Sequence, residues 1–108
     1  MEKDFWEYDP VTDTWLQKSD FGGTARAGAI SFAIAGKGYV GTGQINYSTF
    51  LKDFWQYDTA TGSWIQLNDF PGLDRADAAG FSIGSKGYLG TGDRIINNMT
   101  NIILDFWE

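Results

Sequence analysis

A seven-residue motif occurs twice in this chain and begins a third time, and this repetition limits the choice of fold more than any other feature. Residues 3–9 read Lys-Asp-Phe-Trp-Glu-Tyr-Asp, and residues 52–58 read Lys-Asp-Phe-Trp-Gln-Tyr-Asp, 49 positions later. Residues 105–108 read Asp-Phe-Trp-Glu. A period near 50 residues is typical of repeat architectures, in which each unit buries its apolar face against the next unit.

The repetition extends through the whole unit and is not confined to this motif. At the same shift, equivalent residues include Trp15 and Trp64, Arg26 and Arg75, Tyr39 and Tyr88, Gly41 and Gly90, and Gly43 and Gly92. The register then changes, because 10 positions separate Gly43 from Asp53 but 13 separate Gly92 from Asp105. Insertions are tolerated in loops, so both segments are predicted to be loops. We treat 1–108 as a single unit with repeat 1 (3–51), repeat 2 (52–104) and the start of a third repeat (105–108).

Composition excludes several classes of function. The chain has 43% hydrophobic and 17% aromatic residues, which is too apolar for intrinsic disorder. Its formal net charge of −6 argues against binding to nucleic-acid backbones or anionic lipid, both of which require clustered Lys and Arg. Cys and His are absent, so disulfides and the usual zinc sites are excluded, and no cofactor is predicted. No apolar run approaches the ~20 residues of a transmembrane helix, and no signal peptide is recognised before the first motif.

Short runs of aromatic and β-branched residues predict strands rather than helices. In repeat 2 the expected strands are residues 54–57, 64–67, 78–83 and 88–92, of which 78–83 is small, apolar and expected to be buried. Asp58 can accept hydrogen bonds within the turn 58–63, and Gly62 can supply a positive φ. In repeat 1 Asp13 takes the place of Gly62. The fold class is therefore all-β, with four antiparallel strands per repeat.

The order of these elements resembles the Kelch repeat of β-propellers. That repeat has a small apolar strand, a turn, an aromatic residue with two glycines, a variable loop, an aromatic strand, a six-residue turn and a Trp. The corresponding elements here are residues 29–34, 36–38, Tyr39 with Gly41 and Gly43, 44–51, 54–57, 58–63 and Trp64. The Gly-Thr-Gly spacing in both repeats is similar to that of bacterial Kelch-like propellers of the galactose-oxidase type. The structural repeat motif comprises Trp6, Trp15, Tyr39, Gly41, Gly43, Trp55, Trp64, Tyr88, Gly90 and Gly92.

The resemblance implies that four strands form one propeller blade. Residues 29–34 would be the innermost strand, and the strands that contain Trp15 and Trp64 would be the outermost. Because blades stack face to face, aromatic residues on both faces of a blade are expected to be buried. Each buried aromatic side chain contributes roughly 1.5–3 kcal/mol, so leaving these faces in water would forfeit much of the stability.

The blade count predicts an assembly. The chain would begin with the third and fourth strands of one blade. It would continue with all four strands of a second blade, and end with the first, second and part of the third strand of another. This gives one complete blade and two partial ones. Propellers have about 4–8 blades, so two blade equivalents cannot close a ring. Either the chain is an engineered or truncated part of a longer propeller, or copies associate head to tail. Three copies would give about six blades and four about eight, and six is favoured because six- and seven-bladed rings dominate the resembled family.

Two segments would compete for one position in such a ring. Phe5-Trp6 of one chain and Phe106-Trp107 of its neighbour would both claim the third strand of the shared blade. We expect the N-terminal hairpin to occupy this position, because it also brings the fourth strand. The segment 105–108 would then be displaced or pair at an edge.

The candidate ligand-binding residues are Arg26, Arg75 and Asp77. Both arginines lie in the connection before an innermost strand, on the side of the loops 44–51 and 93–104, where propellers bind ligands. A ring of arginines would suit an anion or a sugar carboxylate. The alternative is a structural role, with Arg75 paired to Asp74 or Asp77. Acid–base catalysis by Asp20, Asp69, Asp74 or Asp77 is not supported, because nothing in the sequence places two carboxyls at glycosidase spacing.

The predicted function is a non-enzymatic scaffold or binding module that assembles with copies of itself and presents a carbohydrate or protein ligand face near the ring axis. The alternative is a fragment of a carbohydrate-active Kelch-type enzyme, similar to sugar epimerases or oxidases, without catalytic residues in this chain. An enzyme should break the repeat symmetry with a unique set of polar residues, and only loop length differs strongly here. The resemblance implies a secreted or periplasmic bacterial parent protein. We predict no catalytic residues and no metal site.

Overall fold

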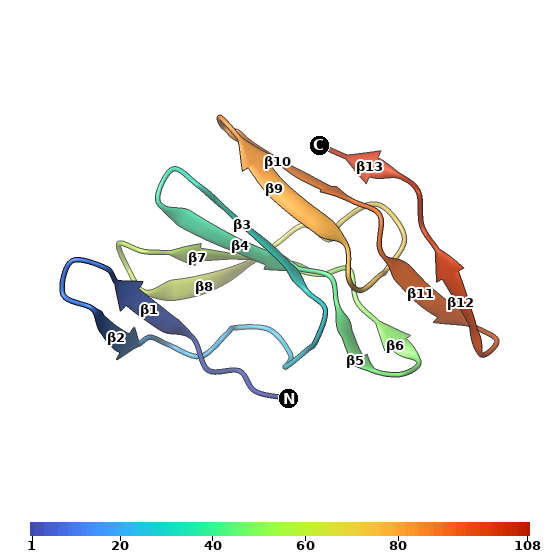
Figure 1. The fold of residues 1–108 in the computed structure, drawn as a ribbon, viewed down its shortest axis with the longest axis horizontal. Coiled ribbons are helices and arrows are strands. Elements are labelled where there is room, and N and C mark those ends of the chain that lie inside the picture. Colours follow the sequence, from blue (N-terminus) through green and yellow to red (C-terminus); the bar gives the residue numbers. More distant parts are fainter.

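The computed structural model describes all residues, 1–108, as strands, turns and bends without a helix. The strands are β1 (Trp6–Asp9), β2 (Thr14–Gln17), β3 (Ile30–Ile34), β4 (Lys37–Gly41), β5 (Gln44–Asn46), β6 (Thr49–Phe50), β7 (Phe54–Asp58), β8 (Ser63–Leu67), β9 (Ala79–Ile83), β10 (Lys86–Gly90), β11 (Asp93–Ile96), β12 (Met99–Ile102) and β13 (Phe106–Trp107). All pairings between these strands are antiparallel, so the all-β prediction is confirmed (Figure 1).

The largest sheet has four strands in the order β3-β4-β7-β8, and we refer to it as the complete sheet. The turn between β7 and β8 forms as predicted, because the Asp58 carboxylate accepts a hydrogen bond from the Ala60 amide at 2.9 Å. Gly62 has a φ of 69° and donates its amide to the Asp58 carbonyl at 2.8 Å. In the equivalent turn of repeat 1, Asp13 has a φ of 53°. Asp tolerates this left-handed region better than most residues. The Asp9 carboxylate accepts from the Val11 amide at 2.8 Å, as Asp58 accepts from Ala60.

Two sheets with fewer strands flank this four-stranded sheet along the chain. The N-terminal hairpin β1–β2 forms a sheet of its own, and β9, β10 and β13 form a sheet with the order β13-β10-β9. In this single chain β13 pairs with its own β10, where Leu89 faces Trp107 and Gly90 faces Phe106. The third copy of the aromatic motif therefore takes the same place in its sheet that β7 takes in the complete sheet.

The two segments predicted to be variable loops are β-hairpins instead. Residues 44–51 contain β5 and β6, and residues 93–104 contain the longer hairpin β11–β12. The longer segment of repeat 2 extends this hairpin and leaves the sheets unchanged. The bridges Ala27–Gln44 and Ala76–Asp93 bring the arginine-containing connections against these hairpins. Figure 1 shows both hairpins at the opposite end of the molecule from β1–β2.

A small core lies between the complete sheet and the sheet β13-β10-β9. Ile30, Phe70 and Leu89 are buried together, and Phe32 and Phe54 pack against them. The prediction that residues 78–83 form a buried strand is only partly correct. The strand forms as β9, but Phe81 and Ile83 are exposed, because no sheet covers its outer face in the single chain.

Both faces of the complete sheet carry aromatic residues, as expected. On one face Tyr57 and Trp64 pack against Phe5, with ring centroids 4.9 and 5.0 Å from that of Phe5. On the opposite face Phe54 packs against Phe32 and Tyr39. The aromatic residues thus link the N-terminal hairpin to the complete sheet on one side and line the inter-sheet core on the other.

Candidate functional site

The outer face of the β1–β2 hairpin is an unpartnered aromatic surface. Tyr8 and Trp15 lie directly opposite each other on the two strands, and their ring centroids are 5.0 Å apart. Their exposed fractions are 44% and 65%, and Trp6 beside them is also exposed. In the complete sheet the equivalent Tyr57 is 5% exposed. The expectation that aromatic residues on both faces are buried therefore fails for this hairpin in the single chain, because no neighbouring sheet covers it.

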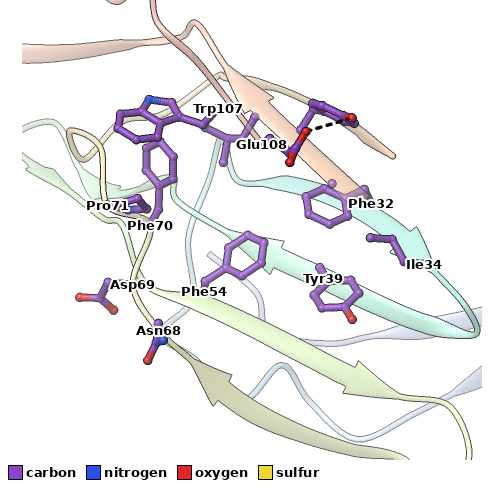
Figure 2. Close-up of a pocket in the computed structure, with 13 residues that line it drawn as sticks. Phe32, Ile34, Tyr39, Phe54, Asn68, Asp69, Phe70, Pro71, Trp107 and Glu108 are labelled. Carbon is purple, nitrogen blue, oxygen red and sulfur yellow. Dashed lines mark hydrogen bonds between the residues drawn. The ribbon is translucent and has the colours of Figure 1, made fainter. Parts of the chain in front are cut away.

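A cavity of about 310 Å³ opens between the complete sheet and the sheet β13-β10-β9. Its walls are mainly apolar, and Figure 2 shows Phe54 and Tyr39 on one side with Phe70 and Trp107 nearby. The Glu108 carboxylate at its rim accepts a hydrogen bond from the Lys86 ammonium at 2.8 Å. A largely apolar cavity that is open to solvent favours an apolar or aromatic occupant.

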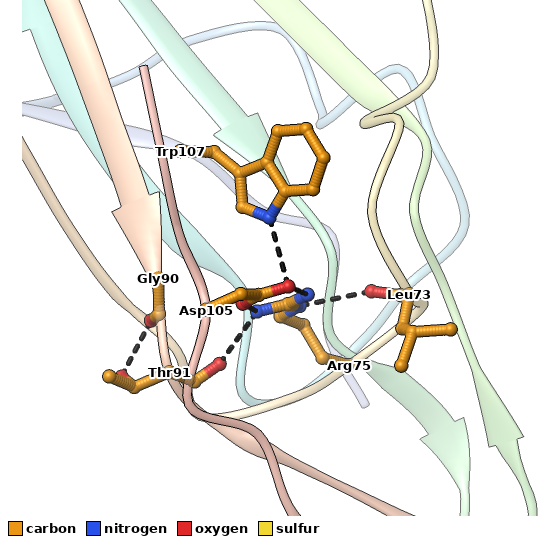
Figure 3. A network of polar contacts seen from close by, with 6 residues as sticks. All are labelled: Leu73, Arg75, Gly90, Thr91, Asp105 and Trp107. Atoms are coloured by element: carbon orange, nitrogen blue, oxygen red, sulfur yellow. Dashed lines mark hydrogen bonds and ion pairs between the residues drawn. The ribbon is translucent and has the colours of Figure 1, made fainter.

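Arg75 joins the connection before β9 to the start of β13 (Figure 3). Its Nη1 and Nη2 both donate to the Asp105 carboxylate, the latter at 2.8 Å, and Nη1 also donates to the Thr91 carbonyl at 3.0 Å. Nε donates to the Leu73 carbonyl at 2.9 Å, and the guanidinium lies 4.8 Å from the centroid of the Phe70 ring. The Arg75 side chain is fully buried. A planar guanidinium with this bidentate geometry fixes two segments with high directional specificity.

Arg26 makes the same contacts in repeat 1. Its Nη1 and Nη2 donate to the Asp53 carboxylate at 2.6 and 2.8 Å, and Nη1 also donates to the Thr42 carbonyl at 3.0 Å. Nε donates to the Thr24 carbonyl at 3.0 Å, and the guanidinium lies 5.0 Å from the centroid of the Phe21 ring. We refer to the two pairs Arg26–Asp53 and Arg75–Asp105 as the arginine clamps.

The Gly-Thr-Gly segments shape the acceptor side of each clamp. Thr42 and Thr91 have φ angles of 58° and 62°, an uncommon conformation for a β-branched residue. This backbone conformation directs each threonine carbonyl to the arginine Nη1. Gly43 follows with a φ of 99°, and a Cβ there would lie 2.7 Å from the Ala27 carbonyl oxygen. The Gly-Thr-Gly segment of each repeat therefore positions the backbone carbonyl that accepts the arginine hydrogen bond.

The Asp of each aromatic motif has a second partner, the indole two residues later. Trp6, Trp55 and Trp107 donate their indole N–H to Asp4, Asp53 and Asp105, at 2.7, 2.7 and 2.9 Å. Asp53 and Asp105 receive an arginine as well, whereas Asp4 has no arginine partner in the chain. The three copies of the motif thus share the aspartate–indole hydrogen bond, and only the copy that contains Asp4 lacks an arginine partner.

The predicted alternative partners of Arg75 are wrong. Asp74 pairs instead with Arg94 at 2.8 Å, and Asp77 lies beside Gly28, to whose carbonyl it donates its amide at 2.9 Å. The sequence had suggested Asp74 and Asp77 because they are neighbours of Arg75 along the chain. The actual partner, Asp105, is 30 residues away, because the extended connection directs the guanidinium across the sheet edge.

Each guanidinium nitrogen of Arg26 and Arg75 already donates to an acceptor within the chain. No cluster of three or more acidic residues lies close enough to hold a metal ion. The structure also has no helix of the length and apolarity needed to cross a membrane. What the arrangement can do chemically is to hold a strand against a sheet edge through a buried cation and a bidentate carboxylate.

The Asp53 carboxyl should titrate below its usual range. Partial burial raises its pKa, but the hydrogen bonds from Arg26 and Trp55 outweigh this and lower the pKa below 3.8. The hydrogen bond from Arg75 likewise lowers the pKa of Asp105 to about 2. The stabilisation by a carboxyl with a lowered folded-state pKa is complete above the unfolded value near 3.8 and is lost as the pH falls through the folded value.

We therefore expect the carboxyl ¹³C resonance of Asp53 to titrate with a midpoint below 3.8. An Asp53→Asn variant should be less stable than the native chain at pH 6, and the difference should shrink as the pH is lowered below 3.8. A constant difference between the two chains over this range would show that the charge of Asp53 does not stabilise the fold.

Reasoning from the sequence missed Asp53 and Asp105 as the partners of the arginines. One signal was available in the sequence: an arginine and an aspartate recur at equivalent places in both repeats, as Arg26 with Asp53 and as Arg75 with Asp105. The separation between arginine and aspartate is 27 residues in repeat 1 and 30 in repeat 2, which hides the pair from a search at fixed spacing.

Comparison with known proteins gives a structural match but no family. No protein-family model matches the chain, and no curated protein sequence matches it. The chain is similar to the solved structure of YjhT, with a TM-score of 0.72 and 26% sequence identity. The match covers 85% of this chain and 29% of the YjhT chain, so this chain spans less than a third of the length of the protein it resembles.

Proposed function

We propose that the chain provides two blade equivalents of a Kelch-type β-propeller and acts as a non-enzymatic scaffold or binding module that assembles head to tail into a closed ring. The observation that carries this proposal is the order of its sheets. A complete four-stranded sheet lies between a two-stranded hairpin and a three-stranded sheet, and each incomplete sheet contains a copy of strands found in the complete one.

The position of the aromatic side chains supports stacking of such sheets. Phe5 and Phe21 of the N-terminal segment pack on Trp64 of the complete sheet, and Phe70 packs on Trp107 across the next interface. The contact of Phe70 with Trp107 repeats that of Phe21 with Trp55 in the first interface. Head-to-tail contacts of this kind generate a ring when the rotation closes.

A non-enzymatic role agrees with the chemistry of the repeated polar residues. The arginine clamps occur in both repeats and are satisfied by carboxylates and carbonyls of the chain itself. In the proposed ring a carbohydrate or protein ligand would bind at the end that carries β5–β6 and β11–β12, where connections and hairpins meet.

The mass of the 108-residue chain under native conditions tests the proposal. A ring of three copies would have a mass of about 36 kDa, three times the 12.0 kDa of one chain, and four copies would have about 48 kDa. Native mass spectrometry at micromolar concentration should give the trimer as the main species. A single species at 12.0 kDa over the full concentration range would overturn self-assembly.

A further inference from the structure

We infer that the 310 Å³ cavity and the free edge of β10 beside it form the docking site for the β1–β2 hairpin of a second copy, and that β13 holds this site until the hairpin replaces it. The inference rests on the proposed self-assembly and names the partner surface. In the docked arrangement Tyr8 and Trp15 of the second copy fill the cavity, and Asp4 of the second copy pairs with Arg75 of the first.

The chain itself contains an occupied version of this interface. Phe5 lies 4.9 Å from Tyr57 and 5.0 Å from Trp64, and Phe21 lies 5.0 Å from Trp64, measured between ring centroids. Tyr57 and Trp64 face each other across β7 and β8. A Tyr–Trp pair from two adjacent strands therefore fills the space in front of the two phenylalanines.

The cavity is the same interface without its Tyr–Trp pair. Phe54 and Phe70, the equivalents of Phe5 and Phe21 at the 49-residue shift, both line it. Trp107 packs on Phe70 with a centroid distance of 5.6 Å, as Trp55 packs on Phe21 at 5.8 Å. The sheet β13-β10-β9 has no fourth strand to supply the remaining aromatic residues.

The β1–β2 hairpin carries the missing pair in the required geometry. Tyr8 and Trp15 face each other with centroids 5.0 Å apart and an interplanar angle of 41°. The corresponding values for Tyr57 and Trp64 are 5.0 Å and 47°. The pair is already formed and exposed in the single chain, so docking would bury large aromatic surfaces with little loss of side-chain freedom.

The backbone edge of β10 can accept the same hairpin. In the complete sheet β4 pairs with β7 over five residues, from Lys37–Asp58 to Gly41–Phe54. In the incomplete sheet β10 pairs with β13 only at Leu89 and Gly90. The outer edge of Lys86, Gly87 and Tyr88 is unpaired, and an exposed edge of this kind is a template for another strand.

The charged residues are consistent with replacement of β13 by the hairpin of a second copy. Arg75 is buried and needs a carboxylate, which Asp105 supplies in the single chain. Asp4 has the same indole partner geometry but no arginine. A docked hairpin in the register of β7 would place the partner copy's aspartate at position 4 where Asp105 lies now, so the buried cation would stay paired throughout.

A backbone amide beyond the hairpin marks the same interface independently. In repeat 1 the amide of Gly43 donates to the Arg75 carbonyl of the following connection at 2.7 Å. Its equivalent in repeat 2, Gly92, donates to no backbone carbonyl in the chain. In the docked arrangement the connection around position 26 of the partner copy would supply the missing acceptor.

Two matched substitutions should shift the assembly in opposite directions. Asp4→Asn and Asp105→Asn each keep an oxygen acceptor for the indole but remove the charge that Arg75 requires. Asp4→Asn should raise the concentration at half-assembly about tenfold or more, since a hydrogen bond between charged groups is lost. Asp105→Asn should lower this concentration by a similar factor, because it weakens only the attachment of β13, which the docking hairpin must displace. Sedimentation equilibrium measures both.

Disulfide capture tests the register. The chain has no cysteine, so Glu7→Cys and Tyr88→Cys can be made on separate chains, one of them ¹⁵N-labelled, and mixed under mild oxidation. These positions correspond to Gln56 and Tyr39, which face each other across β7 and β4. Such pairs have Cα atoms about 5 Å apart, which suits a disulfide. Thr14→Cys mixed with Tyr88→Cys is the control, because β2 should lie one strand away from β10.

The outcomes separate this inference from the proposed function. A covalent heterodimer from positions 7 and 88, but not from 14 and 88, supports the docking site. Oligomers that form normally but give no such heterodimer, or that respond equally to Asp4→Asn and Asp105→Asn, would overturn the docking site and leave self-assembly standing. A chain that remains monomeric in every variant would overturn both.

Discussion

Replacing Tyr57 with alanine is expected to lower the free energy of unfolding by about 3–4 kcal/mol, the largest effect of any single aromatic truncation in this chain. Tyr57 is 5% exposed and contacts both Phe5 and Trp64. Its loss would leave a cavity between the N-terminal hairpin and the complete sheet. The hairpin has no strand pairing with that sheet, so side-chain contacts attach it: these aromatic contacts and the hydrogen bonds that Ser19 makes with Gly62 and Trp64.

The measurement is urea denaturation followed by tryptophan fluorescence, on chains dilute enough to be unassembled. Tyr8→Ala is the matched control, because Tyr8 holds the same place in repeat 1 but is 44% exposed. We expect a change of less than about 1 kcal/mol for Tyr8→Ala in the single chain. Equal losses for the two variants would contradict the assignment of Tyr57 to an internal interface and Tyr8 to an open one.

Replacing Arg75 with methionine is expected to destabilise the chain by about 3 kcal/mol and to release β13. The side chain is fully buried, and its removal takes the arginine donors from the Asp105 carboxylate and from the carbonyls of Leu73 and Thr91. The Asp105 carboxylate then keeps only the hydrogen bond from the Trp107 indole. Methionine fills most of the volume, so the loss reports the polar contacts rather than a void. Arg75→Lys should restore little, because a lysine cannot form the bidentate contact.

Arg94→Met is the control for this change. Arg94 pairs with Asp74 in a more exposed setting, where an ion pair contributes about 0–1 kcal/mol. Denaturation curves give the stability of each variant, and amide hydrogen exchange at Phe106 and Trp107 reports whether β13 is released. If Arg75→Met and Arg94→Met lose the same small amount, the clamp does not hold the third strand.

Local elements of the fold were predictable from the sequence, because each depends on residues close together in the chain. The turns at Asp13 and Gly62 need a residue that tolerates positive φ, and both have it. The strands around Phe54 and Trp64 follow from alternating aromatic and polar residues. The repeat also identified β13 as a third copy of β7, and β13 indeed pairs with β10 as β7 pairs with β4.

Contacts between distant segments were not predictable in the same way. The partner of Arg75 depends on how the connection before β9 crosses the sheet edge, which no local pattern encodes. The hairpins β5–β6 and β11–β12 were mistaken for loops because length variation in a segment does not reveal whether its backbone pairs with itself. The cavity could be found only in the structure, because it arises where the sheet β13-β10-β9 lacks a fourth strand.

The size of the particle in solution is the most direct measure of self-assembly, because a closed ring of three copies is larger than one chain by a known factor. The single chain has a Cα radius of gyration of 14.6 Å. A compact ring of three copies, about 324 residues, should have a radius of gyration of about 20 Å by the scaling of folded proteins. Small-angle X-ray scattering of the 108-residue chain should give that value, with a forward intensity three times that of one chain. A radius near that of the single chain, with the forward intensity of one copy, would contradict the assembly.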